Sequence, residues 1–64
     1  MNEVLIWEQG GQTNVIFARH IINIVENETN GNKYCDIFLS GHEEPFKTSL
    51  TLSEILTQLN ITRQ

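Results

Sequence analysis

The side chains best suited to acid–base or metal chemistry are two histidines, His20 and His42. His42 precedes two glutamates, but a helical zinc motif also requires a second histidine four residues later, where this chain has Phe46. His20 follows Arg19 at a break between two apolar runs, a position typical of a hydrogen-bonded turn residue. We therefore predict that both histidines lie in turns and that neither binds a metal.

The single cysteine, Cys35, is flanked by Tyr34 and Asp36. A nucleophilic thiolate needs positive neighbours or a helix N-terminus to lower its pKa, and a neighbouring carboxylate has the opposite effect. We expect Cys35 to be a small buried apolar side chain. The sequence also has no glycine-rich phosphate loop and no Ser-His-Asp order, so we predict neither enzymatic activity nor a cofactor.

The balance of charge is acidic, with eight acidic and four basic residues and a formal net charge of -4 at pH 7. Attraction to phosphate backbones needs clustered lysine and arginine, whereas the basic residues here are scattered: Arg19, Lys33, Lys47 and Arg63. Most of the glutamates fall in predicted turns and strand ends, where we expect water to solvate them: Glu26, Glu28, Glu43 and Glu44.

A chain of 64 residues predicts a single domain spanning 1–64. Such a short chain buries only about 60% of the surface that its unfolded form exposes, and self-association would add to that burial. No apolar stretch approaches the roughly 20 residues of a membrane span. With one cysteine and an acidic start that does not match a secretory signal, we expect a cytoplasmic protein without membrane contact.

The clearest predicted element is a helix from residue 51 to residue 60. Leu52, Ile55, Leu56 and Leu59 share one helical face. Thr51 and Glu54 have the spacing of a capping box, in which each side chain accepts a hydrogen bond from a backbone N–H group at the helix start.

Everything before this helix has the pattern of strands and turns. Two pairs suited to tight turns, Gly10-Gly11 and Asn30-Gly31, predict hairpins on either side of them. In the fourth strand, Cys35, Ile37 and Leu39 share one face. The predicted strands are residues 4–7, 13–17, 21–26, 33–40 and 46–48. The fold class is therefore α+β, a small antiparallel meander of four or five strands with one C-terminal helix packed on one face.

The first and third predicted strands are apolar on both faces, and one short helix covers only one face of a sheet. The other face must close on itself or contact another molecule. We predict a contact surface on the face that the helix leaves uncovered, formed by Leu5, Trp7 and Ile21 and flanked by Arg19.

From residue 21 onward, the order of segments resembles the opening of a LytTR-type DNA-binding domain. The segments are 21–26 (IINIVE), 34–39 (YCDIFL) and 46–50 (FKTSL), followed by 52–56 (LSEIL). A similar pattern occurs in small FlbD-like flagellar-associated proteins, in which a β-meander also ends in a helix. The basic, aromatic DNA-reading segment of LytTR domains follows the helix, where this sequence has only Thr62-Arg63-Gln64. The resemblance therefore implies a topology and a small bacterial or phage accessory protein, without the DNA-reading residues.

We expect a non-enzymatic protein-interaction module that forms a homo-oligomer, such as a homodimer, or binds a protein partner. Two alternatives remain open. One is a LytTR-like nucleic-acid-binding regulator that gathers the four basic residues on one surface. The other is an acidic mimic that uses Glu26, Glu28, Glu43 and Glu44 to block a basic site on another protein.

Overall fold

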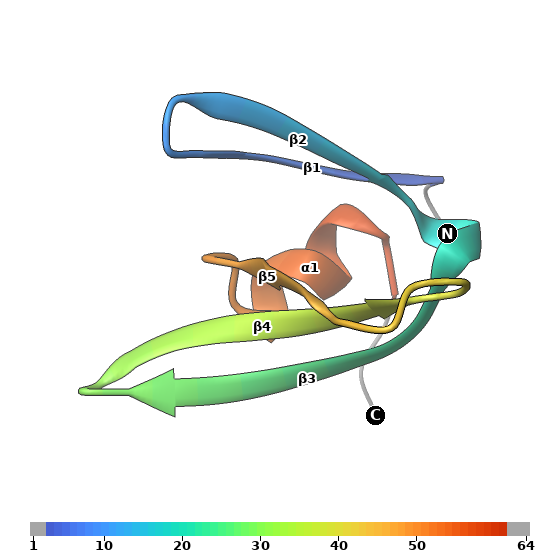
Figure 1. Cartoon of the computed structure of the whole chain (residues 1–64). Helices are drawn as coiled ribbons and strands as arrows, with labels where there is room; N and C mark the ends of the chain where they lie inside the picture. The colour runs from blue at the N-terminus through green and yellow to red at the C-terminus, as the bar shows by residue number, and fades with distance from the viewer. Residues whose placement is uncertain (1–2, 62–64) are drawn as a thin grey trace.

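Two antiparallel sheets enclose one short helix in the computed structural model, which describes residues 3–61 (Figure 1). The first sheet pairs β1 (Val4–Gln9) with β2 (Gln12–Phe17). The second has the order β3-β4-β5, with β3 (Ile21–Thr29), β4 (Asn32–Leu39) and β5 (Phe46–Thr48). The helix α1 (Leu52–Gln58) packs between the sheets. This confirms the α+β class and the order of five strands and a C-terminal helix.

The strands form two separate sheets, whereas the sequence predicted one. The reason is a turn of 3₁₀-helix, η1 (Ala18–His20), which redirects the chain between β2 and β3. It is bonded to residues at the end of a strand in each sheet: the Ala18 N–H donates to the carbonyl of Glu3, just before β1, over 2.8 Å, and the His20 carbonyl accepts from the N–H of Ser40, just after β4, over 2.8 Å. The hairpin β1–β2 therefore lies across from the second sheet instead of continuing it (Figure 1).

Both predicted tight turns are present. Gly10 and Gly11 connect β1 to β2 with φ values of 60° and 77°, and Asn30 and Gly31 connect β3 to β4 with 52° and 80°. Positive φ at both central positions is the requirement of a type I′ turn, whose twist matches that of the flanking strands. These turns fix the register of both hairpins.

The helix begins with the predicted capping box. The Thr51 hydroxyl accepts from the Glu54 N–H over 3.2 Å, and the Glu54 carboxylate accepts from the Thr51 N–H over 2.9 Å. A second carboxylate, that of Glu26 on β3, accepts from the Leu52 N–H over 2.8 Å. Glu26 is thus half-buried and bonded to the helix start, so the prediction that it is solvated is wrong. Its negative charge also suits this end of the helix dipole.

The core lies where the hairpin, β4 and α1 meet. Its buried members come from all three elements: Leu5, Trp7, Ile16, Cys35, Ile37, Ile55 and Leu59. The predicted apolar faces of the helix and of the fourth strand are confirmed by the burial of Ile55 and Ile37. No helix within residues 3–61 has the length and apolar character needed to cross a bilayer.

The face predicted to be left uncovered by the helix is instead the buried one. The exposed fraction is 0% for Leu5 and 5% for Trp7, because both side chains point toward α1 and β4. A contact role for either residue would require the core to open. The same strand exposes its opposite face, on which Ile6 is 47% exposed.

Candidate functional site

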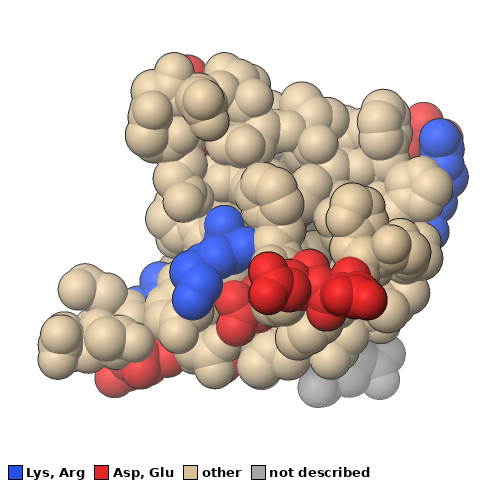
Figure 2. Space-filling model, in the orientation of Figure 1, with Lys and Arg blue, Asp and Glu red and all other residues tan. Residues whose placement is uncertain are grey.

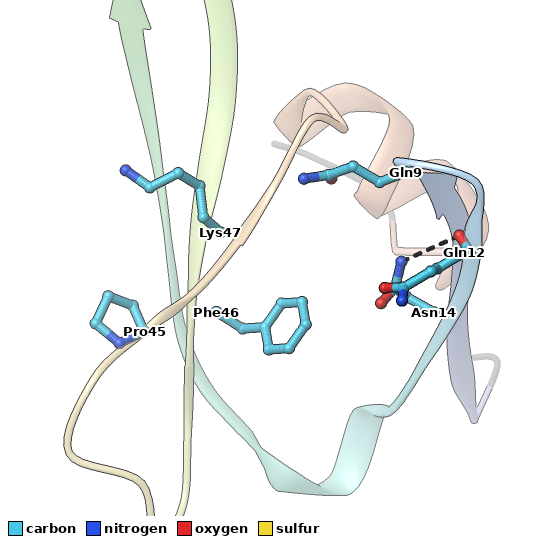
Figure 3. A pocket seen from close by; sticks show the side chains of 6 residues that line it. All are labelled: Gln9, Gln12, Asn14, Pro45, Phe46 and Lys47. Carbon is cyan, nitrogen blue, oxygen red and sulfur yellow. Dashed lines mark hydrogen bonds between the residues drawn. The ribbon is translucent and has the colours of Figure 1, made fainter.

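Two hollows lie between β2 and the chain segment 39–47. The first, of about 320 Å³, is lined by residues from both sheets: Gln9, Gln12, Asn14, Pro45, Phe46 and Lys47. Figure 3 shows the Phe46 ring extending from β5 toward Gln12 and Asn14 on β2. The second, of about 280 Å³, is lined by Val15, Ile16, Phe17, His20, Leu39, Ser40 and His42. Both hollows have β2 as one wall, so β2 borders an open side of the molecule.

Amide groups give the first hollow its polar character. The Gln9 Oε1 atom accepts from the Trp7 Nε1–H over 3.1 Å and from the Ser49 N–H over 3.0 Å, which joins the hairpin to the segment after β5. The Asn14 Nδ2–H donates to the Gln12 carbonyl over 3.4 Å. Phe46 meets Trp7 edge-on, with ring centroids 5.7 Å apart.

His20 and His42 line the second hollow from two different turns. The sequence predicted turn positions for both residues, and it gave no signal that they border the same hollow. Among residues 3–61, no group of three or more His, Cys, Asp or Glu side chains is placed to hold a metal ion.

The described basic residues come from separate elements. Arg19 lies in η1, with its guanidinium 5.1 Å from the centroid of the Phe17 ring, and the Lys47 ammonium on β5 lies 4.8 Å from the centroid of the Tyr34 ring. Lys33 is near the start of β4, and Arg63 lies outside the described residues. Figure 2 shows blue side chains in more than one area of this view, with red acidic side chains directly beside the central blue group.

Cys35 is fully buried on the inner face of β4. Burial raises the pKa of its thiol above the ordinary value, and the carboxylates of Glu26, Asp36 and Glu54 raise it further. The thiol is therefore protonated and inert at neutral pH, which matches its predicted packing role. Folding becomes less favourable as the pH rises past the ordinary thiol pKa, because the unfolded chain then loses this proton first.

We expect Cys35 to react with a disulfide reagent such as DTNB at pH 8 far more slowly in the folded protein than in the unfolded chain. Both the raised pKa and the lack of access reduce the rate. The control is the same protein in concentrated guanidinium chloride, where reaction should be complete within the mixing time. Equal rates in the two solutions would contradict the burial of this thiol.

The outer face of the hairpin is apolar and exposed. Ile6 pairs with Val15 across the two strands and Val4 pairs with Phe17. Ile6, Val15 and Phe17 are 47%, 51% and 48% exposed. These four residues, Val4, Ile6, Val15 and Phe17, form what we call the hairpin patch.

The predicted site residues separate in the structure. Leu5 and Trp7 lie in the core, Ile21 is half-buried against it, and only Arg19 is exposed, beside Phe17 of the hairpin patch. The hairpin patch could not be predicted from the sequence, because the inner face of β2 carries the polar Asn14 beside Ile16. The alternation in residues 13–17 places Val15 and Phe17 together on the other face, and it therefore indicates that face as the buried one.

A scan against protein-family models finds no match, and searches of curated proteins and of solved structures also find none. The resemblance to LytTR-type and FlbD-like proteins thus stays a prediction from the sequence.

Proposed function

We propose that this protein is a non-enzymatic interaction module that associates with a second copy of itself through the hairpin β1–β2. The observation that carries the proposal is the hairpin patch, in which three large apolar side chains remain about half exposed. Contiguous apolar surface of this kind marks interaction sites on soluble proteins.

A second copy fits this surface better than a highly charged partner does. No charged residue occurs between Gln9 and Ala18, so β2 offers no ionic contacts of its own to such a partner. The small core of a 64-residue chain also gives self-association a stabilising role, since the interface extends the buried apolar area. The acidic balance, with four basic against eight acidic residues, supports a protein partner over a nucleic acid.

Replacing Val15 with lysine should shift the protein toward the monomer. Val15 is at the centre of β2 and is already half exposed, so the variant should fold. In the contact, however, the new ammonium must lose water or lie close to the same charge of the second copy. We expect the dissociation constant of the self-associated form to rise about tenfold or more, which corresponds to about 1.4 kcal/mol. Sedimentation velocity over a concentration series measures it.

The matched control is Ile22→Lys. Ile22 is 68% exposed on β3 in the other sheet, so this variant makes the same change in charge away from the hairpin. Its association should equal that of the unsubstituted protein. A protein that sediments as a monomer up to millimolar concentration would refute the proposed function, and equal weakening by the two variants would place the contact elsewhere.

A further inference from the structure

The strand edges of the two sheets are protected to different extents. On the free edge of β1, the Ile6 N–H donates to the Gln58 Oε1 atom over 2.9 Å and the Ile6 carbonyl accepts from Gln58 Nε2 over 2.7 Å. The β3 strand has a bulge between Ile21 and Asn23 and carries Glu26 and Glu28. The β5 strand has three residues and follows Pro45. Bulges, charges, proline and short length are the features by which natural sheets prevent unwanted strand pairing.

The outer edge of β2 has none of these protections. Its six residues, Gln12–Phe17, pair with β1 in an unbroken register and include no proline and no charge. Among the described strands, none pairs with this edge. A regular, uncharged edge of this length is a template for another strand.

The contacts of Gln58 show which residues of β2 present their backbone groups outward. Because the N–H and the carbonyl of Ile6 both bond to Gln58, they point away from β2, and Ile6 and Val15 form a non-hydrogen-bonded pair. The N–H and carbonyl of Val15 therefore point to the open edge. Because this direction alternates along a strand, the N–H and carbonyl groups of Thr13 and Phe17 also point to the open edge.

We propose that two copies associate by antiparallel pairing of β2 with β2, about a two-fold axis at Val15. This deepens the proposed function and rests on it. Val15 then faces Val15 of the second copy and Thr13 faces its Phe17, and each such pair exchanges two backbone hydrogen bonds. An axis at Asn14 would instead place Phe17 opposite Gly11, which lies in the turn. The axis at Val15 is thus the one that pairs all three outward-facing residues within the strands.

Charge supports the antiparallel direction. Glu8 pairs with Thr13 on the outer face, and the Arg19 guanidinium lies over the Phe17 ring. In the proposed dimer, Thr13 lies opposite Phe17 of the second copy. Glu8 of one copy and Arg19 of the other therefore reach the same end of the joined outer face, where opposite charges attract across the boundary. A parallel pairing would gather both Glu8 side chains at one end of the joined face and both Arg19 side chains at the other.

The pairing is tested by disulfide cross-linking of Val15→Cys. Directly opposed residues of a hydrogen-bonded antiparallel pair have Cα atoms about 5.5 Å apart, within the range that a disulfide spans. The matched control is Ile6→Cys, in the same row of the outer face but on β1. The two Ile6 positions would lie three strand spacings apart, about 14 Å, which is too far to bridge. Cys35 is buried and does not compete.

Under mild oxidation we expect the Val15→Cys dimer to form about tenfold faster or more than the Ile6→Cys dimer, because only the first pair meets the geometric limit. Equal rates in a protein that still sediments as a dimer would overturn the β2 pairing and leave the proposed function standing. A monomeric protein at every concentration would overturn both.

A charge exchange gives a second readout that needs no cysteine. Glu8→Lys and Arg19→Glu should each weaken association severalfold, and the double variant should restore most of it, because the two charges again have opposite sign across the boundary. Circular dichroism confirms that each variant is folded. A double variant no tighter than the weaker single variant would overturn the pairing.

Discussion

Ile55→Ala should unfold a large part of the protein at room temperature. Ile55 is fully buried in the middle of α1 and packs in the cluster where the helix meets both sheets. Truncating a buried isoleucine to alanine costs about 2–5 kcal/mol. A domain of this length has about 3–10 kcal/mol of total stability at the usual value per residue, so the loss is comparable to the whole. Urea unfolding followed by circular dichroism measures the change.

The control for this variant is Thr57→Ala, two residues further along the same helix. Thr57 is exposed, and its hydroxyl donates to the Ser53 carbonyl within the helix. Alanine has the higher helix propensity, so stability should change by less than about 0.5 kcal/mol. Both variants must be compared at one protein concentration, because the proposed self-association would add to the apparent stability. Similar midpoints of urea unfolding for the two variants would show that α1 does not hold the sheets together.

Trp7→Ala should be about as damaging as Ile55→Ala. The Trp7 ring is 5% exposed, meets Phe46 edge-on and donates its Nε1–H to Gln9. Replacing a buried tryptophan with alanine costs about 3–5 kcal/mol, and here the change also leaves the Gln9 amide with one partner fewer. We expect the variant to be largely unfolded at about 37 °C, so that circular dichroism no longer shows a cooperative thermal transition on heating from that temperature.

Ile6→Ala is the matched control, since Ile6 is the neighbouring residue and points to the opposite face. It is 47% exposed, so its truncation removes few contacts within the monomer. The midpoint of thermal unfolding should fall by only a few degrees, as expected when the free energy of unfolding drops by about 1 kcal/mol or less in a domain of this size. A larger effect for Ile6 than for Trp7 would reverse the assignment of the inner and outer faces of β1.

The elements could be predicted from the sequence because each is marked locally. Thr51 and Glu54 mark the helix start, and Asn30-Gly31 demands a hairpin of one type. The five strands and the helix therefore lie near where the patterns place them. The strands β1 and β3 run two and three residues beyond the predicted ends, and α1 is shorter than the predicted helix 51–60. Such signals span a few residues and need no knowledge of distant contacts.

The exposed face of the hairpin could not be predicted, because both faces of β1 are apolar and the choice depends on contacts far along the chain. Gln58, 52 residues beyond Ile6, fixes the edge of β1, and Gln9 bonds to Ser49, 40 residues away. The division into two sheets likewise depends on η1, whose bonds join Glu3 to Ala18 and His20 to Ser40. Amide side chains at these positions carry no periodic signal.

The Gln58 side chain of α1, which bonds to the edge of β1, has a consequence for how large an assembly can become. Its amide occupies the backbone groups of Ile6 in the way that a neighbouring strand would. If both edges of the hairpin were free, further copies could add one after another into a fibril, because each added copy would again present an unpaired strand edge. Under the proposed pairing, with one side already occupied, growth would stop after a single addition, and the product would be a closed, finite pair.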